Sequence, residues 1–584
     1  MVDYYWHTGS KSPLVRYQTW RRNRHQPLND DRKEKDDTDP QRAQVLQRLH
    51  DKHAPAILET LLELKGLYIK LGQVLSVTAL PIPEAYRERF RTLQSNVPGW
   101  EDFDSVVRPV LEREIVPTDM SLDDIFESID DIPVGSASIG QAHKARLTKK
   151  YAQRLGQSDD DRDVILKVQY PDAAWQVPAD IRCVGDFMKI CVWAGVVNES
   201  AANLSFNEFA RQFMSELDYD RESINLAAIH EQSLDPTAPY QKRNVVVPKV
   251  FPDLCSRKVI AMTYLPGAKL EEEAKRQLAV LGIDTSRGIK SVVRDAAVEA
   301  SEPNNPESGE LIRRVTGRMK SQKPPVDSWK LASASKWIGY LVGVDTILWA
   351  VRFAKRVILW YDAAAVKTLD LLPVPNSWYP KSWRSWVEDH RKSLAQARQL
   401  SLTAAWMDAL FDVHGHQVFI GGRFNADPHP GNILIVEDNE GAPTNRLGLI
   451  DYGQCKELSP DEQVRIAQLV LSVANNESDE RIASAFRNLG ITTKNDSTQF
   501  LATFGRLIFG PFRPEHLDHK WHRRLHSLDY VMYFPKELSM VYRTSLLLRG
   551  LAVSLQLNYS VSQQWKHHAQ KAIERHPELC LPLG

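Results

Sequence analysis

The sequence predicts an α+β protein with two lobes, the first rich in strands and the second mostly helical. The first lobe is assigned to residues 119–270, where short apolar runs with β-branched residues read as strands. The second lobe, residues 401–584, is dominated by segments of helical periodicity. The predicted helices are Ser401–Gly415, Glu462–Ala474, Ser478–Leu489, Ser497–Phe509 and Lys536–Leu557. The third observation is a hairpin with polar residues at its ends, which lies between the first and second of these helices.

Length and composition limit the class of protein. A chain of 584 residues with 43% hydrophobic residues is globular and too long for one ordinary core. Basic and acidic residues both number 74, so no global charge indicates nucleic acid as a partner. The five cysteines form no C-x-x-C pair, which argues against a zinc knuckle or disulfide scaffold and favours a reducing compartment.

Three further segments complete the predicted organisation. Residues 1–50 are polar and predict disorder, and residues 51–118 predict a helical extension. Residues 271–400 read as a linker followed by an apolar, Trp-rich insertion ahead of the hairpin. The basic tract Arg16–Arg24 fits either an organelle transit peptide or an unstructured tail. Within the insertion, Trp337–Tyr361 fits either an interfacial membrane helix or a helix packed on the second lobe.

The hairpin carries the first candidate functional site. Two apolar runs, Ile433–Val436 and Leu447–Ile450, read as its strands. Asp427 and Asn432 precede the first strand with the Asp-x-x-x-x-Asn spacing of a kinase catalytic loop, and Asp451 follows the second where Asp-Phe-Gly would stand. Phosphoryl transfer uses one carboxylate to orient a nucleophile, and an amide and a second carboxylate to hold Mg²⁺. The alternative is an ordinary polar hairpin, because Asp, Asn and Gly are common in turns.

A lysine within a strand is the second candidate. Lys167 lies inside the apolar run 164–168, and a lysine there requires a partner. It either extends to solvent from an edge strand or binds phosphate, paired with a glutamate on a nearby helix. The helix predicted for Phe206–His230 carries Glu216, Asp218 and Glu222. Asp218 and Glu222 are four residues apart and would share a face, which is either solvated or ion-paired.

A loop of small residues is the third candidate. Small residues let backbone N–H groups approach phosphate oxygens, although many tight hairpins have the same composition. The expected nucleotide contacts from this loop are Ser136, Ala137, Ser138, Ile139, Gly140 and Gln141. Met262, on the strand predicted for Lys258–Tyr264, is also among the expected nucleotide contacts. The turn Leu265–Gly267 that follows this strand suits a hinge between lobes. Another strand is predicted for Val245–Val250.

The extension contributes an unusual helix. A helical pattern begins at Pro40 and continues through Ala54–Leu80, which predicts one amphipathic helix interrupted by Lys70, Gly72 and Gln73. A glycine inside a helix costs about 1 kcal/mol relative to alanine, so Gly72 predicts the close approach of another surface. The alternative is a surface helix with solvated lysines.

Five motifs together resemble the aarF-domain, UbiB-type atypical kinase-like family, which includes ubiquinone-pathway kinase-like proteins of mitochondria and bacteria and a plastid branch. They occur in family order, and the resemblance covers about 61–557 apart from the insertion near 285–395. The motifs are K-x-G-Q at Lys70–Gln73, the small-residue loop with S-I-G-Q-x-H at Ser136–His143, E-x-D at Glu216–Asp218, A-D-P-H-P-G-N at Ala426–Asn432, and the triplet Asp451–Gly453.

The resemblance implies roles for individual residues. Lys167 would contact nucleotide phosphates and pair with Glu222, and Asp427 would be the catalytic-loop aspartate. Asn432 and Asp451 would be Mg²⁺ ligands, with ATP or ADP as the nucleotide.

The resemblance also assigns a regulatory role to the extension. Lys70 and Gln73 would lie on a helix across the active-site mouth, with Lys70 facing Glu216 and Asp218. In the family, that helix blocks the groove in which a peptide substrate would bind, and the packing there would explain Gly72.

The implied function is an ATPase or a small-molecule kinase in quinone or membrane-lipid metabolism. Two alternatives remain: a nucleotide-gated scaffold in a membrane-associated biosynthetic complex, and a true protein kinase. The expected partners are lipid- or quinone-pathway enzymes and a membrane surface, without nucleic acid. The expected location is mitochondrial and membrane-associated, with plastid and cytoplasm as alternatives.

Overall fold

The computed structural model describes residues 40–77, 83–94, 102–137, 139–159, 161–193, 206, 210–211, 213–273, 276, 402–438, 443–513, 516, 519–555 and 557–583. The basic tract 16–24, most of the linker and insertion (277–400), and Ser138 lie outside the described residues. Within the described part of the chain, no helix is long and apolar enough to cross a membrane.

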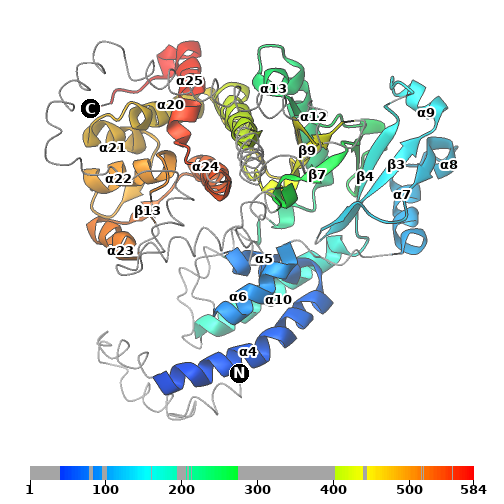
Figure 1. Cartoon of the computed structure of the whole chain (residues 1–584), viewed down its shortest axis with the longest axis horizontal. Coiled ribbons are helices and arrows are strands. Elements are labelled where there is room, and N and C mark those ends of the chain that lie inside the picture. The colour runs from blue at the N-terminus through cyan, green and yellow to red at the C-terminus, as the bar shows by residue number, and fades with distance from the viewer. Residues whose placement is uncertain are drawn as a thin grey trace, which may run out of the picture.

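The first lobe is built on an antiparallel sheet (Figure 1). Its path is β1-β3-β4-β6, and β2 pairs with β3. The strands are β1 (Phe126–Ile129), β2 (Gly135–Ser136), β3 (Gly140–Leu147), β4 (Asp163–Gln169) and β6 (Val259–Thr263). Side chains at alternate positions of β4, including Val164, Leu166 and Val168, join a buried cluster with Leu111 of α7. The opposite face of β4 presents Lys167 toward α12 (Tyr219–Leu234).

A second sheet joins the two lobes. Its order is β5-β10-β9-β7, comprising β5 (Val245–Val246), β10 (Pro443–Leu449), β9 (Ile433–Glu437) and β7 (Gly267–Lys269). The predicted hairpin is confirmed, because β9 and β10 pair antiparallel with Ile433 opposite Leu449. The strand predicted for Val245–Val250 is wrong in length: Val245 and Val246 pair with β10, whereas Val250 forms an isolated bridge with Met262 of β6. The predicted turn passes directly into β7.

Gly267, at the start of β7, has a φ of +151°. A Cβ there would collide with the carbonyl oxygen of Ile435 on β9. This close backbone approach therefore requires glycine.

The second lobe is helical, as predicted. After a helix over residues 402–416 come α20 (Pro460–Ala474), α21 (Asp479–Asn488), α22 (Thr498–Phe509), α23 (His519–Leu528), α24 (Lys536–Ser554) and α25 (Val561–Arg575). Ser459, Ser478 and Ser497 cap α20, α21 and α22 by accepting from backbone N–H groups. Short strands join this lobe: β8 (Arg423–Asn425) with β11 (Cys455–Glu457), and β12 (Thr492–Thr493) with β13 (Val531–Tyr533).

Short helical segments fill the connections of both lobes. They are α7 (Arg108–Ile115), α8 (Leu122–Ile125), α9 (Lys149–Arg154), α13 (Pro239–Lys242), η1 (Arg91–Gln94), η2 (Phe103–Val107), η3 (Pro252–Leu254), η5 (Gln417–Gly421), η6 (Pro430–Asn432) and η8 (Pro577–Leu579).

The first helix of the extension, α4 (Pro40–Leu64), begins at the residue where the helical pattern begins, with a proline at the first position, where no N–H is needed. The boundary predicted at residue 50 therefore falls inside this helix. The single helix predicted for Ala54–Leu80 is wrong: Lys65 (φ 61°) and Gly66 (φ 40°) are left-handed and separate α4 from α5 (Gly66–Val77). Figure 1 shows α4, α5 and α6 (Glu84–Phe90) gathered with α10 (Ala173–Trp193).

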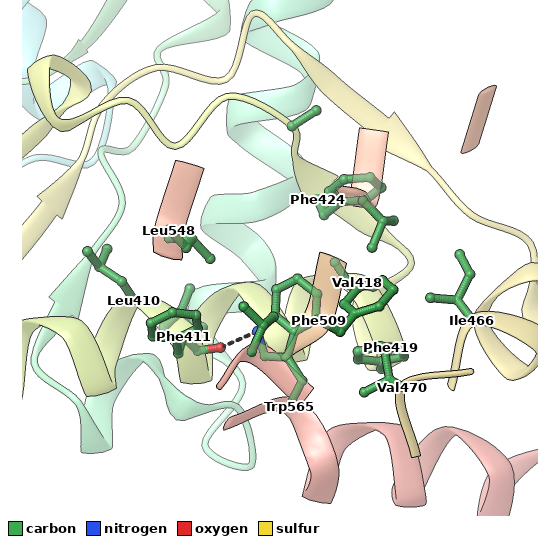
Figure 2. Close-up of a cluster of buried hydrophobic side chains, with 14 of the residues drawn as sticks. Leu410, Phe411, Val418, Phe419, Phe424, Ile466, Val470, Phe509, Leu548 and Trp565 are labelled. Atoms are coloured by element: carbon green, nitrogen blue, oxygen red, sulfur yellow. Dashed lines mark hydrogen bonds between the residues drawn. The ribbon is translucent and has the colours of Figure 1, made fainter. Parts of the chain in front are cut away.

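The core of the second lobe surrounds Trp565, which is fully buried (Figure 2). Its ring packs against Phe419 and Phe509, with centroids 5.9 and 6.4 Å away. Its Nε1–H donates to the carbonyl oxygen of Phe411 at 3.0 Å, so the buried indole N–H is satisfied. Trp565 therefore attaches α25 to the helix 402–416, which leads toward the catalytic hairpin.

We expect Trp565→Ala to lower the free energy of unfolding by about 3–5 kcal/mol, because it opens a cavity in the core and removes the hydrogen bond to the Phe411 carbonyl. Trp175→Ala is the control, since that side chain is 64% exposed, and we expect a change within about 0.5 kcal/mol. Urea denaturation followed by circular dichroism measures both. Equal losses in the two variants would contradict this description of the core.

Candidate active site

A buried ion pair links β4 to α12. Lys167 Nζ donates to both carboxylate oxygens of Glu222, at 2.6 and 2.8 Å. The Lys167 ammonium also lies 5.0 Å from the centroid of the Tyr219 ring, which adds a cation–π contact. The strand lysine and its helical glutamate partner are thus brought together.

The charged groups around this pair shift one another's pKa values. Burial alone lowers the pKa of Lys167, but the carboxylates of Glu222 and Asp451 outweigh it and raise the pKa above its ordinary value. Burial raises the pKa of Glu222 to about 7, and Asp451 and Glu216 add to this effect while Lys167 opposes it. Carboxylates raise one another's pKa when they share a site, so this cluster favours the arrival of a cation.

The candidate metal ligands lie at the ends of the hairpin strands. Asn432 ends η6 directly before β9, and its backbone carbonyl oxygen accepts from the Ile450 N–H at 3.2 Å. Asp451 follows Ile450 in the sequence. Its Oδ1 accepts from the Gly453 N–H at 3.0 Å, which fixes the carboxylate in a tight turn. An amide and a carboxylate are thus presented from adjacent strand ends, and these oxygen donors suit Mg²⁺.

Asn425 connects the two halves of the hairpin. Its Nδ2 donates to the Asp451 carbonyl at 2.9 Å, and its Oδ1 accepts from the Asp427 N–H at 2.8 Å. The side chain is buried, so it holds the backbone at Asp427 against the triplet Asp451–Gly453. Asn425 is not among the residues predicted from the sequence, and its place directly before the A-D-P-H-P-G-N motif is the available signal.

Helix α12 contacts the same triplet. Asn225, one turn after Glu222, donates from Nδ2 to the Tyr452 carbonyl at 3.2 Å. Both side chains are buried on the same helical face. The helix therefore positions the glutamate for Lys167 and the backbone beside Asp451 together.

The small-residue loop forms a tight hairpin between β2 and β3. Ser136 pairs with Gln141, and the Ala137 N–H donates to the Gly140 carbonyl at 2.8 Å. A Cβ on residue 140 would lie 2.5 Å from the Val168 carbonyl oxygen and 2.7 Å from the Tyr219 hydroxyl. The close approach of this loop to β4 therefore requires glycine at position 140. Ile139, in contrast, is buried with α10 residues of a small apolar cluster.

Met262 lies away from solvent. It pairs with Ile165 across β4 and β6 and is 7% exposed. Both side chains belong to the buried cluster that continues into the second lobe. Its packing is that of a core residue, and a nucleotide contact there remains a prediction.

An ion pair connects the extension to the region of Glu216 and Gln454. Lys70 Nζ lies 2.9 Å from Glu216 Oε1, and the same oxygen accepts from Gln454 Nε2 at 3.3 Å. Burial lowers the pKa of Lys70, but Glu216, Asp427 and Asp451 outweigh it and raise the pKa. Helix α5 is therefore tied to the chain just after the metal-binding triplet, as the resemblance implied for Lys70 and Glu216.

The other residues predicted to be regulatory have local partners. The helix predicted for Phe206–His230 is wrong in that it is interrupted at 216–218, before α12 begins. Asp218 is exposed and caps α12 by accepting from the Arg221 N–H at 3.0 Å, and its expected place facing Lys70 stays a prediction. Gln73 donates to the Leu93 carbonyl at 2.7 Å. The close approach predicted at Gly72 is confirmed, and the approaching side chain, 2.5 Å from its Cβ position, is Leu93 of the extension itself.

A residue missed from the sequence contacts Asp427. Arg543 of α24 places Nη2 3.3 Å from Asp427 Oδ2. Its neighbour Thr544 donates to the Asn425 carbonyl at 3.4 Å. No local pattern signals this contact, because more than a hundred residues separate Arg543 from the loop that it touches.

Comparison with known proteins agrees with this geometry. Residues 92–294 and 390–485 match the ABC1 atypical kinase-like domain. Over 258 residues the chain is 30% identical to the chloroplastic Protein ACTIVITY OF BC1 COMPLEX KINASE 3 of Arabidopsis thaliana, covering 43% of this chain and 33% of that protein. It is 27% identical over 233 residues to "Probable protein kinase UbiB" of Shewanella woodyi, covering 39% and 38%. These alignments span less than half of each relative.

A solved structure, the complex of Rv3197 with erythromycin from Mycobacterium tuberculosis, aligns over 91% of this chain and 98% of that chain. The sequence identity is 17% and the TM-score 0.39.

A double-mutant cycle tests the tie between the extension and the cleft. For Lys70→Met and Glu216→Gln we expect a coupling free energy of about 1–3 kcal/mol, because the two side chains are only 27% and 16% exposed. The control cycle uses Lys189 and Asp186, an exposed pair at 2.8 Å on α10, for which we expect less than about 0.5 kcal/mol. Urea denaturation provides the four stabilities of each cycle. Additive effects at Lys70 and Glu216 would argue against the tie.

Proposed function

The chain belongs to the ABC1 atypical kinase-like family, and we propose that it binds ATP with Mg²⁺ between its lobes and cleaves the γ-phosphoryl bond. The observation that carries this proposal is the ion pair of Lys167 with Glu222, whose pKa values are both raised by the nearby Asp451 carboxylate. Asn432 joins this region through the hydrogen bond from the Ile450 N–H to its backbone carbonyl. An ion-paired strand lysine, an amide and a carboxylate are the groups that phosphoryl transfer requires.

In this proposal each residue of the site has a separate role. Lys167, held by both oxygens of Glu222, would donate to nucleotide phosphate oxygens, and N–H groups of the loop before Gly140 would approach them. Asn432 and Asp451 would hold Mg²⁺, which supplies positive charge against the phosphates when bound. Asp427, oriented by Asn425 and Arg543, would accept a hydrogen bond from the attacking hydroxyl or water.

The acceptor in this proposal is water or a small molecule of quinone or membrane-lipid metabolism. The support is the ion pair between Lys70 and Glu216, which ties α5 beside the triplet where a peptide substrate would have to pass. The relatives named "Probable protein kinase UbiB" and "Protein ACTIVITY OF BC1 COMPLEX KINASE 3, chloroplastic" support the kinase part of this proposal. A mitochondrial, membrane-associated location, and lipid- or quinone-pathway enzymes as partners, belong to the same proposal.

A nucleotide-gated scaffold is the second candidate. The connection from Lys70 through Glu216 to Gln454 favours the scaffold. Gln454 directly follows the triplet Asp451–Gly453, so a nucleotide that moved this triplet would also move the extension. Full rescue of a strain lacking the protein by Asp427→Asn would favour the scaffold. Phosphate transfer to a partner protein after deletion of residues 61–80 would instead favour a protein kinase.

Asp451→Asn tests the enzyme proposal. We expect the wild type to bind Mg²⁺–ADP and the variant to bind it at least about tenfold more weakly, a loss of about 1.4 kcal/mol, because a charged ligand is removed. Isothermal titration calorimetry measures both affinities, and Asp253→Asn, on the exposed surface of η3, is the control. Wild-type protein that binds no nucleotide with Mg²⁺ would overturn the proposal.

Arg543→Gln tests the positioning of Asp427. We expect kcat for ATP hydrolysis to fall about tenfold or more while nucleotide affinity changes less than about twofold, because Arg543 contacts Asp427 and not the groups proposed to bind phosphate. Arg524→Gln, exposed on α23, is the matched control. A loss confined to KM would show that Arg543 contributes to nucleotide binding instead.

A further inference from the structure

A second cluster of titratable side chains lies on elements that carry none of the proposed nucleotide or metal ligands. Asp412 is on the helix 402–416, and His567 and His568 are on α25. Asp412 Oδ1 lies 2.7 Å from His568 Nε2 and 3.2 Å from His567 Nε2. One oxygen and two nitrogens of this set lie within 4.8 Å of one another.

The packing around His568 favours this arrangement. A Cβ on Gly415 would lie 2.7 Å from His568 Cδ2 and 2.8 Å from Trp565 Cδ1. Glycine within a helix costs about 1 kcal/mol relative to alanine, and here it makes room for the histidine ring next to Asp412. The two histidine rings, adjacent in sequence, have centroids only 3.7 Å apart and incline toward the same oxygen.

A further contact orients the Asp412 carboxylate. Arg243 Nε contacts the other Asp412 oxygen, Oδ2, at 2.6 Å, so Oδ1 is directed at the histidines.

We propose that Asp412, His567 and His568 bind a divalent transition metal ion of the zinc class, which joins α25 to the helix 402–416. Two imidazole nitrogens with one carboxylate oxygen suit Zn²⁺ and do not suit Mg²⁺, which prefers oxygen ligands. Ligand atoms about 2.0–2.2 Å from a tetrahedral zinc ion lie about 3.3 Å from one another. The observed separations of 2.7 and 3.2 Å need only a small expansion to reach this value.

The site is accessible from one side. The His567 side chain is 52% exposed, whereas those of Asp412 and His568 are 10% and 4% exposed. Solvent can therefore supply the fourth ligand next to His567. The plain alternative is a hydrogen-bond network in which both rings donate to Asp412 and no ion takes part.

Zinc titration of the full-length protein decides between the two. After treatment with chelator and dialysis into excess Mg²⁺, ZnCl₂ is titrated by calorimetry into wild type, His567→Ala and His576→Ala. His567 is half-exposed, so its removal leaves the core intact. His576 is the matched control, since it also faces a carboxylate, Glu578, at 3.4 Å on the same part of the chain.

We expect one high-affinity Zn²⁺ site in the wild type and in His576→Ala, weakened at least about tenfold in His567→Ala. Co²⁺ in place of Zn²⁺ should give a visible absorption band that is lost with His567→Ala, and Zn²⁺ should raise the melting temperature only when His567 is present. Equal Zn²⁺ affinity in wild type and His567→Ala, or no binding by the wild type, would overturn the proposal.

Discussion

The ion pair between Lys167 and Glu222 is the contact on which the rest of the site depends. Two buried charges are expensive to desolvate, and removing one partner leaves the other uncompensated, at a cost of about 3–5 kcal/mol. The chain must therefore hold α12 against β4 with both charges in register. Once α12 is placed in this way, Asn225 reaches the Tyr452 backbone, so the ion pair positions the hairpin as well as the lysine.

A chain of polar side chains continues from this pair through the second lobe. Asn225 connects α12 to the triplet, Asn425 connects the triplet to the catalytic loop, and Arg543 connects that loop to α24. Each link satisfies a buried backbone group or pairs a charge, and a lost link would leave a partner unsatisfied. The site is thus organised by amides and a guanidinium outside the motif residues that would perform the chemistry.

The sequence predicted those parts of the structure whose signals are local. Periodicity predicted both hairpin strands and most helices of the second lobe, but not α23 or α25. Motif spacing predicted that Lys167, Glu222, Asn432 and Asp451 belong to one site. The break at Lys65 was not predictable, because nothing in an amphipathic pattern indicates a left-handed lysine. The same holds for Asp218, whose capping role depends on the chain turning just before α12. Contacts such as Arg543 with Asp427 are set by tertiary packing, which no local pattern encodes.

The shared sheet has a consequence for how the chain can vary. Strand β7 leaves the first lobe and pairs with β9 of the second, so Lys269 lies opposite Leu434 although more than 160 residues separate them in the sequence. The entropy of closing a loop grows only with the logarithm of its length, and halving the loop would change the closure free energy by about 0.6 kcal/mol. The number of residues between 276 and 402 therefore has little effect on the free energy of pairing β7 with β9. Residues 402–432 are different, because they carry Asn425, Asp427 and Asn432 of the site itself.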